Sequence, residues 1–376
     1  MIPKIETLNI ERFRGLRQLK IEGLARVNLI TGRNNTGKTS VLEAIRILAS
    51  DASWPVIREI LLSREEYVDE ADEAASPIDA GGFFLLSSLF HGFPGFSGHL
   101  QPITVASGSA SGTMGLNITA GWFVAQTDAD GSTRWVQQDD VVADEGQATP
   151  GIVIASRGGV RRLWPLDTLR RNSTRNWALG AGVALGPPLS CIFISPYGAE
   201  RTAALGPLWD AIALSDHEKD VVEALRIIDP RISAVSMVGG ESPRRARTVI
   251  ARAEGLPRAV PLRLFGDGTN RLFGIILSLV NANGGLLLID EFENGLHHTV
   301  QTDVWRAVFK LARTLDVQVV ATSHSWDAVE SFQEAASEHP DEGVLIRLSR
   351  RGEDVIPTLF REDELAIATR DHIEVR

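Results

Sequence analysis

The chain has 376 residues, of which 44% are hydrophobic and 23% charged, and its formal net charge is -10. This length accommodates two ordinary domains or one large domain with a long insertion, and this composition excludes disordered and fibrous proteins. The acidic balance disfavours a dedicated polycationic nucleic-acid binder, although a local basic face can still attract phosphates.

The sequence favours a cytoplasmic protein. Cys191 is the only cysteine, so disulfides within the chain and cysteine-based zinc clusters are excluded. The N-terminal segment carries charges where a secretion signal needs an apolar core. Because no run of about 20 continuous apolar residues occurs, we expect neither a bilayer-spanning helix nor a membrane partner.

The first elements predicted along the chain are two strands and a helix. Apolar runs at 5–10 and 27–30 predict strands, with a turn at 13–15 between them. The second run leads into a glycine-containing loop, after which apolar residues recur at helical spacing over 40–48. The order is therefore strand, loop, helix.

The loop between this strand and helix fits the phosphate-binding pattern G-x-x-x-x-G-K-[ST]. Its residues are Gly32, Arg33, Asn34, Asn35, Thr36, Gly37, Lys38 and Thr39, and Ser40 follows them. The glycines allow backbone N–H groups to surround phosphate oxygens at the helix N-terminus. Lys38 would neutralise the β and γ phosphates of ATP, and the Thr39 hydroxyl would ligate Mg²⁺.

A change of composition divides the chain. From about 80 to 190 it is rich in Gly, Ser and Thr with short alternating segments, which predicts an antiparallel β insertion. We therefore expect the N-terminal half of a core at 1–79, the insertion at 80–195 and the C-terminal half at 196–376. Helical periodicity returns at 208–228.

Two apolar strands in the last third end in polar side chains. The run 285–289 precedes Asp290 and Glu291, as expected for a buried parallel strand that ends at a ligand crevice. Asp290 would hold Mg²⁺, and Glu291 would orient or deprotonate the attacking water. The mostly apolar run at 317–323 ends beside His324, which could sense the γ phosphate by a hydrogen bond. We therefore expect Glu291, His324 and Lys38 to be the catalytic residues.

These motifs together resemble ATPases of the ABC and SMC type, specifically the bacterial OLD-like and AbiEii-like group of AAA family ATPases. The resemblance rests on FRG at 13–15, the phosphate loop, LLLIDEFENGLHH at 286–298 and ATSHS at 321–325. It implies an α/β P-loop NTPase of ABC-ATPase head type, with a mixed, mainly parallel central sheet, helices on both faces and the inserted antiparallel β region. It also implies that Arg14 approaches the base or ribose, that 293–297 is a D-loop at a dimer interface, and that His324 is the switch histidine.

The signature loop departs from the family pattern. Gly266, Asp267 and Gly268 precede an apolar helix at 272–280, where the family usually has a Ser-x-Gly core. In the family this helix N-terminus binds the γ phosphate on the opposite subunit, so backbone N–H groups and the helix dipole would here replace the serine hydroxyl. The resemblance thus implies a homodimer that forms on ATP binding. No glutamine of a Q-loop is assignable.

The resemblance also suggests partners and a role in antiphage defence or DNA maintenance. Residues 325–376 are too few for the TOPRIM nuclease of related OLD proteins, which leaves a separately encoded nuclease open. The resemblance suggests a partner effector, such as a nuclease or toxin. Arginine clusters at Arg157–Arg175 and Arg244–Arg258 are candidates for nucleic-acid contact, and ordinary solvated surface is the alternative. No Asn-Lys pair of a GTPase motif exists, and no heptads predict long SMC arms. A DNA-associated, ATP-gated clamp with little turnover remains a second hypothesis.

Overall fold

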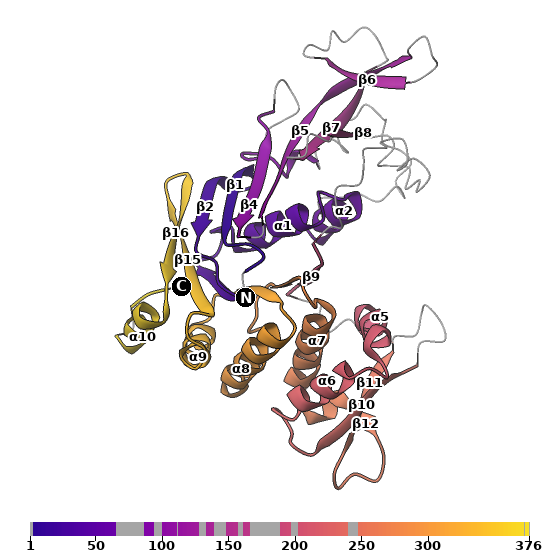
Figure 1. Cartoon of the computed structure of the whole chain (residues 1–376), viewed down its shortest axis with the longest axis vertical. Coiled ribbons are helices and arrows are strands. Elements are labelled where there is room, and N and C mark those ends of the chain that lie inside the picture. The colour runs from indigo at the N-terminus through magenta and orange to yellow at the C-terminus, as the bar shows by residue number, and fades with distance from the viewer. Residues whose placement is uncertain are drawn as a thin grey trace.

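The computed structural model describes residues 3–64, 86–93, 100–110, 112–127, 133–138, 148–156, 161–165, 189–196, 202–239, 247–371 and 373–375. Two β-sheets with helices between and beside them make up its main body (Figure 1). No helix within these ranges is long and apolar enough to cross a membrane.

The central sheet has six strands in the order β16-β15-β3-β14-β13-β9. Their bounds are β3 (Val27–Gly32), β9 (Cys191–Ile194), β13 (Leu286–Ile289), β14 (Gln318–Thr322), β15 (Gly343–Arg351) and β16 (Asp354–Phe360). All neighbours are parallel except β16, which pairs with β15 in the antiparallel sense. This confirms the mixed, mainly parallel sheet that the sequence predicted.

Helices cover both faces of this sheet, so its strands are apolar on both sides. The helices are α1 (Lys38–Ala49), α2 (Trp54–Ser63), α5 (Thr202–Ile212), α6 (His217–Leu225), α7 (Asp267–Asn281), α8 (His298–Thr314), α9 (Trp326–Ser337) and α10 (Glu362–Arg370). Along β13, Leu287 and Ile289 pack into one core with α7, α8 and α9, whereas Leu286 and Leu288 pack into another with α1. This alternation explains the continuous apolar run that precedes Asp290.

The second sheet is antiparallel and has the order β2-β1-β4-β5-β7-β8, with β6 paired to β5. Its strands are β1 (Thr7–Phe13), β2 (Leu16–Glu22), β4 (Ile103–Ser109), β5 (Gly112–Thr127), β6 (Thr133–Gln138), β7 (Ala148–Ser156) and β8 (Arg161–Pro165). The predicted antiparallel region is thus confirmed, and β4 joins it to the N-terminal hairpin by pairing with β1. By contrast, β9 lies inside the predicted range 80–195 but pairs with β13 in the central sheet.

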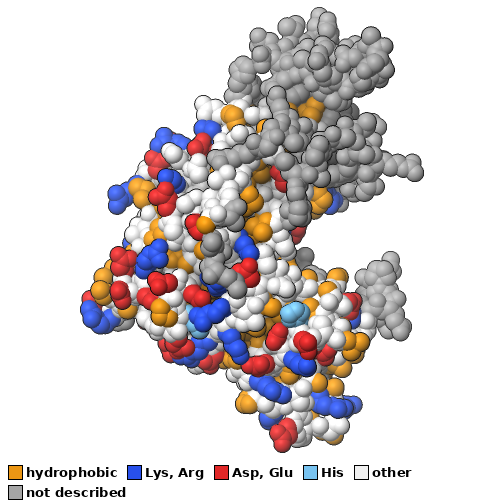
Figure 2. Space-filling model, viewed as in Figure 1, with side chains coloured by type: hydrophobic (Ala, Val, Ile, Leu, Met, Phe, Trp, Pro, Cys, Tyr) orange, Lys and Arg blue, Asp and Glu red, His pale blue; other side chains and the backbone are white. Residues whose placement is uncertain are grey.

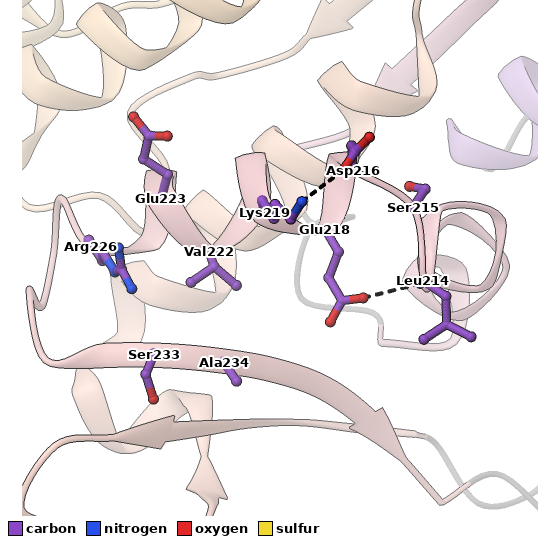
Figure 3. Close-up of a pocket in the computed structure, with 10 residues that line it drawn as sticks. All are labelled: Leu214, Ser215, Asp216, Glu218, Lys219, Val222, Glu223, Arg226, Ser233 and Ala234. Atoms are coloured by element: carbon purple, nitrogen blue, oxygen red, sulfur yellow. Dashed lines mark hydrogen bonds and ion pairs between the residues drawn. The ribbon is translucent and has the colours of Figure 1, made fainter.

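A smaller unit of helices and strands precedes α7. It contains α5, α6 and a three-stranded sheet of β10 (Ile232–Val238), β11 (Thr248–Ala253) and β12 (Val260–Pro261), followed by a 3-10 turn, η2 (Leu262–Phe265). The helical segment expected at 208–228 is two helices, because the chain turns at Leu214, whose φ is 65°. A groove of about 630 Å³ lies between α6 and β10 and is shown in Figure 3. It contains none of the predicted nucleotide-binding residues.

Candidate nucleotide-binding and hydrolysis site

The phosphate loop connects β3 to α1, as the sequence predicted. Gly32 ends β3 with a φ of 146°, and a Cβ at this position would lie 2.6 Å from the Leu348 carbonyl oxygen. Gly37, the N-cap of α1, has a φ of 91°. Both positions therefore require glycine, the first for close backbone approach and the second for its left-handed conformation.

The side chain of Lys38 lies along the phosphate loop. Its Nζ donates hydrogen bonds to the carbonyl oxygens of Gly32 at 2.7 Å and of Arg33 at 3.2 Å. Burial lowers the pKa of the Lys38 ammonium, and the charges of Asp290, Glu293 and Glu291 act in the opposite direction. The ammonium is thus already held beside the loop, where phosphate oxygens can replace these carbonyls as its hydrogen-bond acceptors.

Thr39 and Asp290 lie together, although 251 positions separate them in sequence. The Thr39 hydroxyl donates to the two Asp290 carboxylate oxygens at 3.0 and 3.2 Å. Asp290 is 3% exposed, and burial raises the pKa of its carboxyl group, partly offset by hydrogen bonds from Thr322 and Thr39. A buried carboxylate beside a hydroxyl is an oxygen donor set of the kind that Mg²⁺ prefers, so these residues fit the ion.

Glu291 has a backbone conformation that is rare for glutamate, with a φ of 49°. Its N–H donates to the Thr322 hydroxyl at 2.9 Å, and its carbonyl accepts from Arg271 Nη2 at 3.0 Å. Its carboxylate accepts from Asn294 Nδ2 at 2.7 Å and is 37% exposed. Three separate contacts therefore hold this residue, and its carboxylate remains open to solvent.

His324 follows the end of β14 and lies beside Glu291. Its Nδ1 is 3.2 Å from Glu293 Oε1 and 3.9 Å from Glu291 Oε1, and half of its side chain is exposed. The His324 backbone N–H also donates to Glu293 Oε1 at 3.0 Å. Glu293, the first residue of the predicted D-loop, therefore positions the histidine.

Aromatic packing anchors the carboxylate loop, the segment 290–294 that follows β13. Phe292, which directly follows Glu291, is fully buried and stacks on Trp305 of α8 with ring centroids 3.8 Å apart. The rings of Trp305 and Phe332 of α9 form a T-shaped pair with centroids 5.0 Å apart. The backbone of this loop is thus anchored in the core, which helps to maintain the unusual conformation of Glu291.

The signature-like loop stands at the N-terminus of α7. Gly266 is the N-cap, with a φ of 116°. The Thr269 hydroxyl donates hydrogen bonds to the carbonyl of Gly266 and, at 3.1 Å, to that of Leu262. A Cβ at Gly268 would lie 3.1 Å from the Gly295 carbonyl oxygen. The side chain of Asp267 lies outside the described residues. The loop therefore contacts the predicted D-loop directly.

Replacing Gly266 by serine should not restore the pattern of the family. A Cβ at this position would meet no atom within 4 Å, but a φ of 116° is strained for any residue with a side chain. We expect Gly266→Ser to destabilise the protein by about 1–2 kcal/mol. Thermal unfolding of Gly266→Ser beside Ser278→Ala would check this, and an unchanged midpoint for the serine variant would contradict it.

Arg14 is buried at the turn between β1 and β2. Its side chain is 2% exposed, and its Nε lies 2.8 Å from a carboxylate oxygen of Glu43 in α1. Its carbonyl accepts a hydrogen bond from His91 Nδ1 when that nitrogen is protonated. This burial does not support a contact with the base or ribose, because the guanidinium faces α1 rather than the surface of the loop.

Two residues of the site were missed by sequence analysis. Thr322 donates to Asp290 Oδ1 at 2.6 Å while it accepts from Glu291, so one hydroxyl connects both carboxylate residues. Arg271 of α7 is 3% exposed and donates to the carbonyls of Ser195, Asp290 and Glu291. A threonine at the end of β14 was a signal for the first, but no pattern identifies the second.

The arginine clusters are only partly described. The side chains of the cluster at Arg157–Arg175 lie outside the described residues, as do Arg244 and Arg245. Arg247 forms an ion pair with Asp210 at 2.7 Å, whereas Arg252 and Arg258 are exposed. On the face in Figure 2, basic and acidic side chains intermingle over the described elements. These observations leave nucleic-acid contact a prediction.

Two family models match this chain. Residues 199–329 match the model described as "AAA domain, putative AbiEii toxin, Type IV TA system". Residues 4–80 match the model described as "AAA ATPase domain". The first range contains the carboxylate loop and His324, and the second contains the phosphate loop.

Proteins of known sequence are also similar to it, among them the following three. An "ATP/GTP phosphatase" of Helicobacter pylori is 22% identical over 96% of this chain and 96% of that one. An uncharacterized protein of Methanocaldococcus jannaschii is 42% identical over 72 residues, which are 18% of this chain and 33% of that one. The DNA replication and repair protein RecF of Acinetobacter baylyi is 45% identical over 51 residues, 14% of each chain. The last two matches thus span much less than two-thirds of those relatives.

A solved structure has the same fold at low sequence identity. It is an SMC head bound to the C-winged helix domain of ScpA, with a TM-score of 0.50 and 12% identity. The similarity covers 96% of this chain and 99% of that chain. The expected ABC-ATPase head architecture is therefore confirmed.

Proposed function

Because this chain is a P-loop ATPase of the ABC and SMC type, we propose that two copies dimerise around two ATP molecules and use the hydrolysis cycle as a conformational switch. The observation that carries the proposal is the convergence of five groups at one edge of the central sheet. They are Lys38, Thr39, Asp290, Glu291 and His324, from the ends of three neighbouring strands.

Each of these groups has a chemical role in the proposed reaction. Lys38 and the N–H groups of the loop bind the phosphates, and Thr39 and Asp290 would hold Mg²⁺, which supplies further neutralisation of phosphate charge. Glu291 orients the attacking water and accepts its proton, and His324 donates a hydrogen bond near the γ phosphate. Asn294 keeps the Glu291 carboxylate in place at 2.7 Å.

The dimer is proposed from the signature-like loop and the D-loop. Gly268 is packed against Gly295, so the two segments form one continuous surface. The N-terminus of α7 offers backbone N–H groups and a favourable dipole for an anion. We propose that this surface meets the nucleotide bound by the other copy, as the family resemblance implies.

Solution mass tests the dimer. Glu291→Gln should block hydrolysis and trap the nucleotide-bound state, so its mass measured by light scattering should double with Mg-ATP. The double variant with Lys38→Ala should remain monomeric, because it lacks the phosphate-binding ammonium. A monomeric mass of Glu291→Gln at saturating Mg-ATP would overturn the dimer, and a dimer without ATP would indicate a different interface.

The biological role that we propose is antiphage defence or DNA maintenance, in the cytoplasm and with a separately encoded effector such as a nuclease or toxin. The match to a model that names an AbiEii toxin supports the first, and the partial similarity to RecF supports the second. Co-purification of the chain from its native cells would test for the effector. Recovery of the chain alone under ATP-trapping conditions would count against it.

The second candidate is a DNA-associated, ATP-gated clamp with little turnover. The similarity to a DNA replication and repair protein favours it over other binding modules. A clamp of this kind should bind DNA with strong salt dependence, since each neutralised phosphate releases counterions. DNA binding with negligible hydrolysis would favour the clamp, whereas rapid hydrolysis without DNA would favour the switch.

A further inference from the structure

The tip of the β15–β16 hairpin lies beside the phosphate loop. β15 runs parallel to β3, and Leu348 is opposite Gly32, where the loop begins. The two backbones approach so closely that a Cβ at Gly32 would lie 2.6 Å from the Leu348 carbonyl oxygen. The residues after Leu348 therefore emerge at the edge of the sheet where the loop stands.

Arg350 extends from this tip to the loop. Its Nη2 donates to the Asn35 carbonyl at 3.2 Å, and a Cβ at Gly15 would lie 3.5 Å from the same nitrogen. Arg350 is exposed, as are Arg33, Asn34 and Asn35 of the loop. The guanidinium thus occupies the surface between the phosphate loop and the turn that connects β1 to β2.

The hairpin tip is held in this position by a second contact. Arg17 at the start of β2 donates to both carboxylate oxygens of Asp354, at 2.8 and 2.6 Å. Because this pair is exposed, its contribution to stability is small, but its two parallel hydrogen bonds fix direction. The tip is therefore tied to β2 on one side and to the loop on the other.

Arg350 lies at the same turn between β1 and β2 as Arg14, for which the family resemblance implied a contact with the base or ribose. Arg14 is buried against Glu43, whereas Arg350 presents its guanidinium at the same turn from the surface. A guanidinium has five N–H donors, and the contact with Asn35 uses one nitrogen. Its plane can also stack on an aromatic base. Lys38, in contrast, contacts the carbonyls at the beginning of the loop.

We propose that Arg350 binds the nucleoside end of the nucleotide, its ribose and base, outside the phosphate cradle. This inference rests on the proposed function, because it assigns a further contact to the same nucleotide. It predicts that Arg350 affects the binding of a nucleotide but not of a bare chain of phosphates. That difference separates it from a role in shaping the phosphate loop, which would affect both ligands.

Calorimetric titration of the full chain with a non-hydrolysable ATP analogue and with inorganic tripolyphosphate, both with Mg²⁺, tests the proposal. Arg350→Ala should weaken binding of the analogue about tenfold, as expected for a lost charged hydrogen bond. Its affinity for tripolyphosphate should change by less than about twofold. Arg351→Ala is the matched control, since it removes the adjacent exposed arginine, and it should bind both ligands like the wild type.

The other outcomes are distinct. Equal weakening of both ligands by Arg350→Ala would overturn the proposal in favour of a role in the loop or at the phosphates. Unchanged affinity for the analogue would overturn it as well. A wild-type chain that binds neither ligand would overturn the proposed function, and this inference with it.

Discussion

Glu291→Gln should lower kcat for ATP hydrolysis about a thousandfold while it leaves the Kd for Mg-ATP nearly unchanged. The amide keeps the size of the carboxylate, and its oxygen can still accept the hydrogen bond that Asn294 donates at 2.7 Å. What it loses is the negative charge that orients and deprotonates water. Steady-state phosphate release gives kcat, and equilibrium titration gives Kd.

The control for this variant is Glu254→Gln, which removes an exposed carboxylate on the turn after β11. It should retain the kcat of the wild type. A second comparison is Glu293→Gln, whose carboxylate accepts from the backbone of His324 at 3.0 Å. We expect a smaller loss of kcat there, about tenfold, because that residue positions another group. Retention of wild-type kcat by Glu291→Gln would exclude Glu291 as the base.

The functional residues that could be predicted from the sequence are those whose chemistry requires a fixed spacing along the chain. The P-loop pattern places Lys38 and Thr39 on the first turn of α1, where the structure has them. The apolar run before Asp290 predicts a buried strand because both faces of the central sheet are covered. Local patterns of this kind predicted the core of the fold and the positions of the main catalytic candidates.

Contacts between distant segments were not predictable in the same way. Arg350 reaches Asn35 across 315 positions, and Arg271 reaches Glu291 across 20, yet neither arginine belongs to a spaced motif. For Arg14, the motif that contains it suggests a ligand contact, whereas in the structure its side chain pairs with Glu43. An arginine side chain is long enough to reach several alternative hydrogen-bond partners, so its actual partner depends on tertiary packing.

The left-handed conformation of Glu291 illustrates why the site needs these missed residues. A glutamate at a φ of 49° is strained by about 1 kcal/mol or more, so the surrounding contacts must hold it. Thr322, Arg271 and the stacked pair Phe292–Trp305 provide them from three other elements. Sequence spacing specifies which group is catalytic, and tertiary contacts specify where its carboxylate points.

Asp290→Asn should abolish hydrolysis yet make the ligand-free protein more stable at neutral pH. Burial raises the pKa of the Asp290 carboxyl group in the folded chain above its value in the unfolded chain. Such a group favours folding fully below its unfolded pKa, and this contribution is lost as the pH rises through the folded pKa. The neutral amide avoids that loss. Thermal unfolding without Mg²⁺ or nucleotide should therefore show a higher Tm for Asp290→Asn at pH 7.

With ligand present, the wild type should instead have a higher Tm than Asp290→Asn. Wild-type protein should gain Tm with Mg-ATP, because a cation beside Asp290 compensates its buried charge, and the variant should gain much less. The Tm advantage of the ligand-free variant should shrink as the pH falls through the raised pKa of the wild-type Asp290 carboxyl, because that group is neutral below it. Asp216→Asn is the control, since Lys219 lowers the pKa of that exposed carboxyl. The prediction would be contradicted if Asp290→Asn had a lower Tm than the wild type at pH 7, or if their Tm difference were the same at every pH. Either result would show that the hydrogen bonds of the Asp290 carboxylate with Thr39 and Thr322 outweigh the cost of burying its charge.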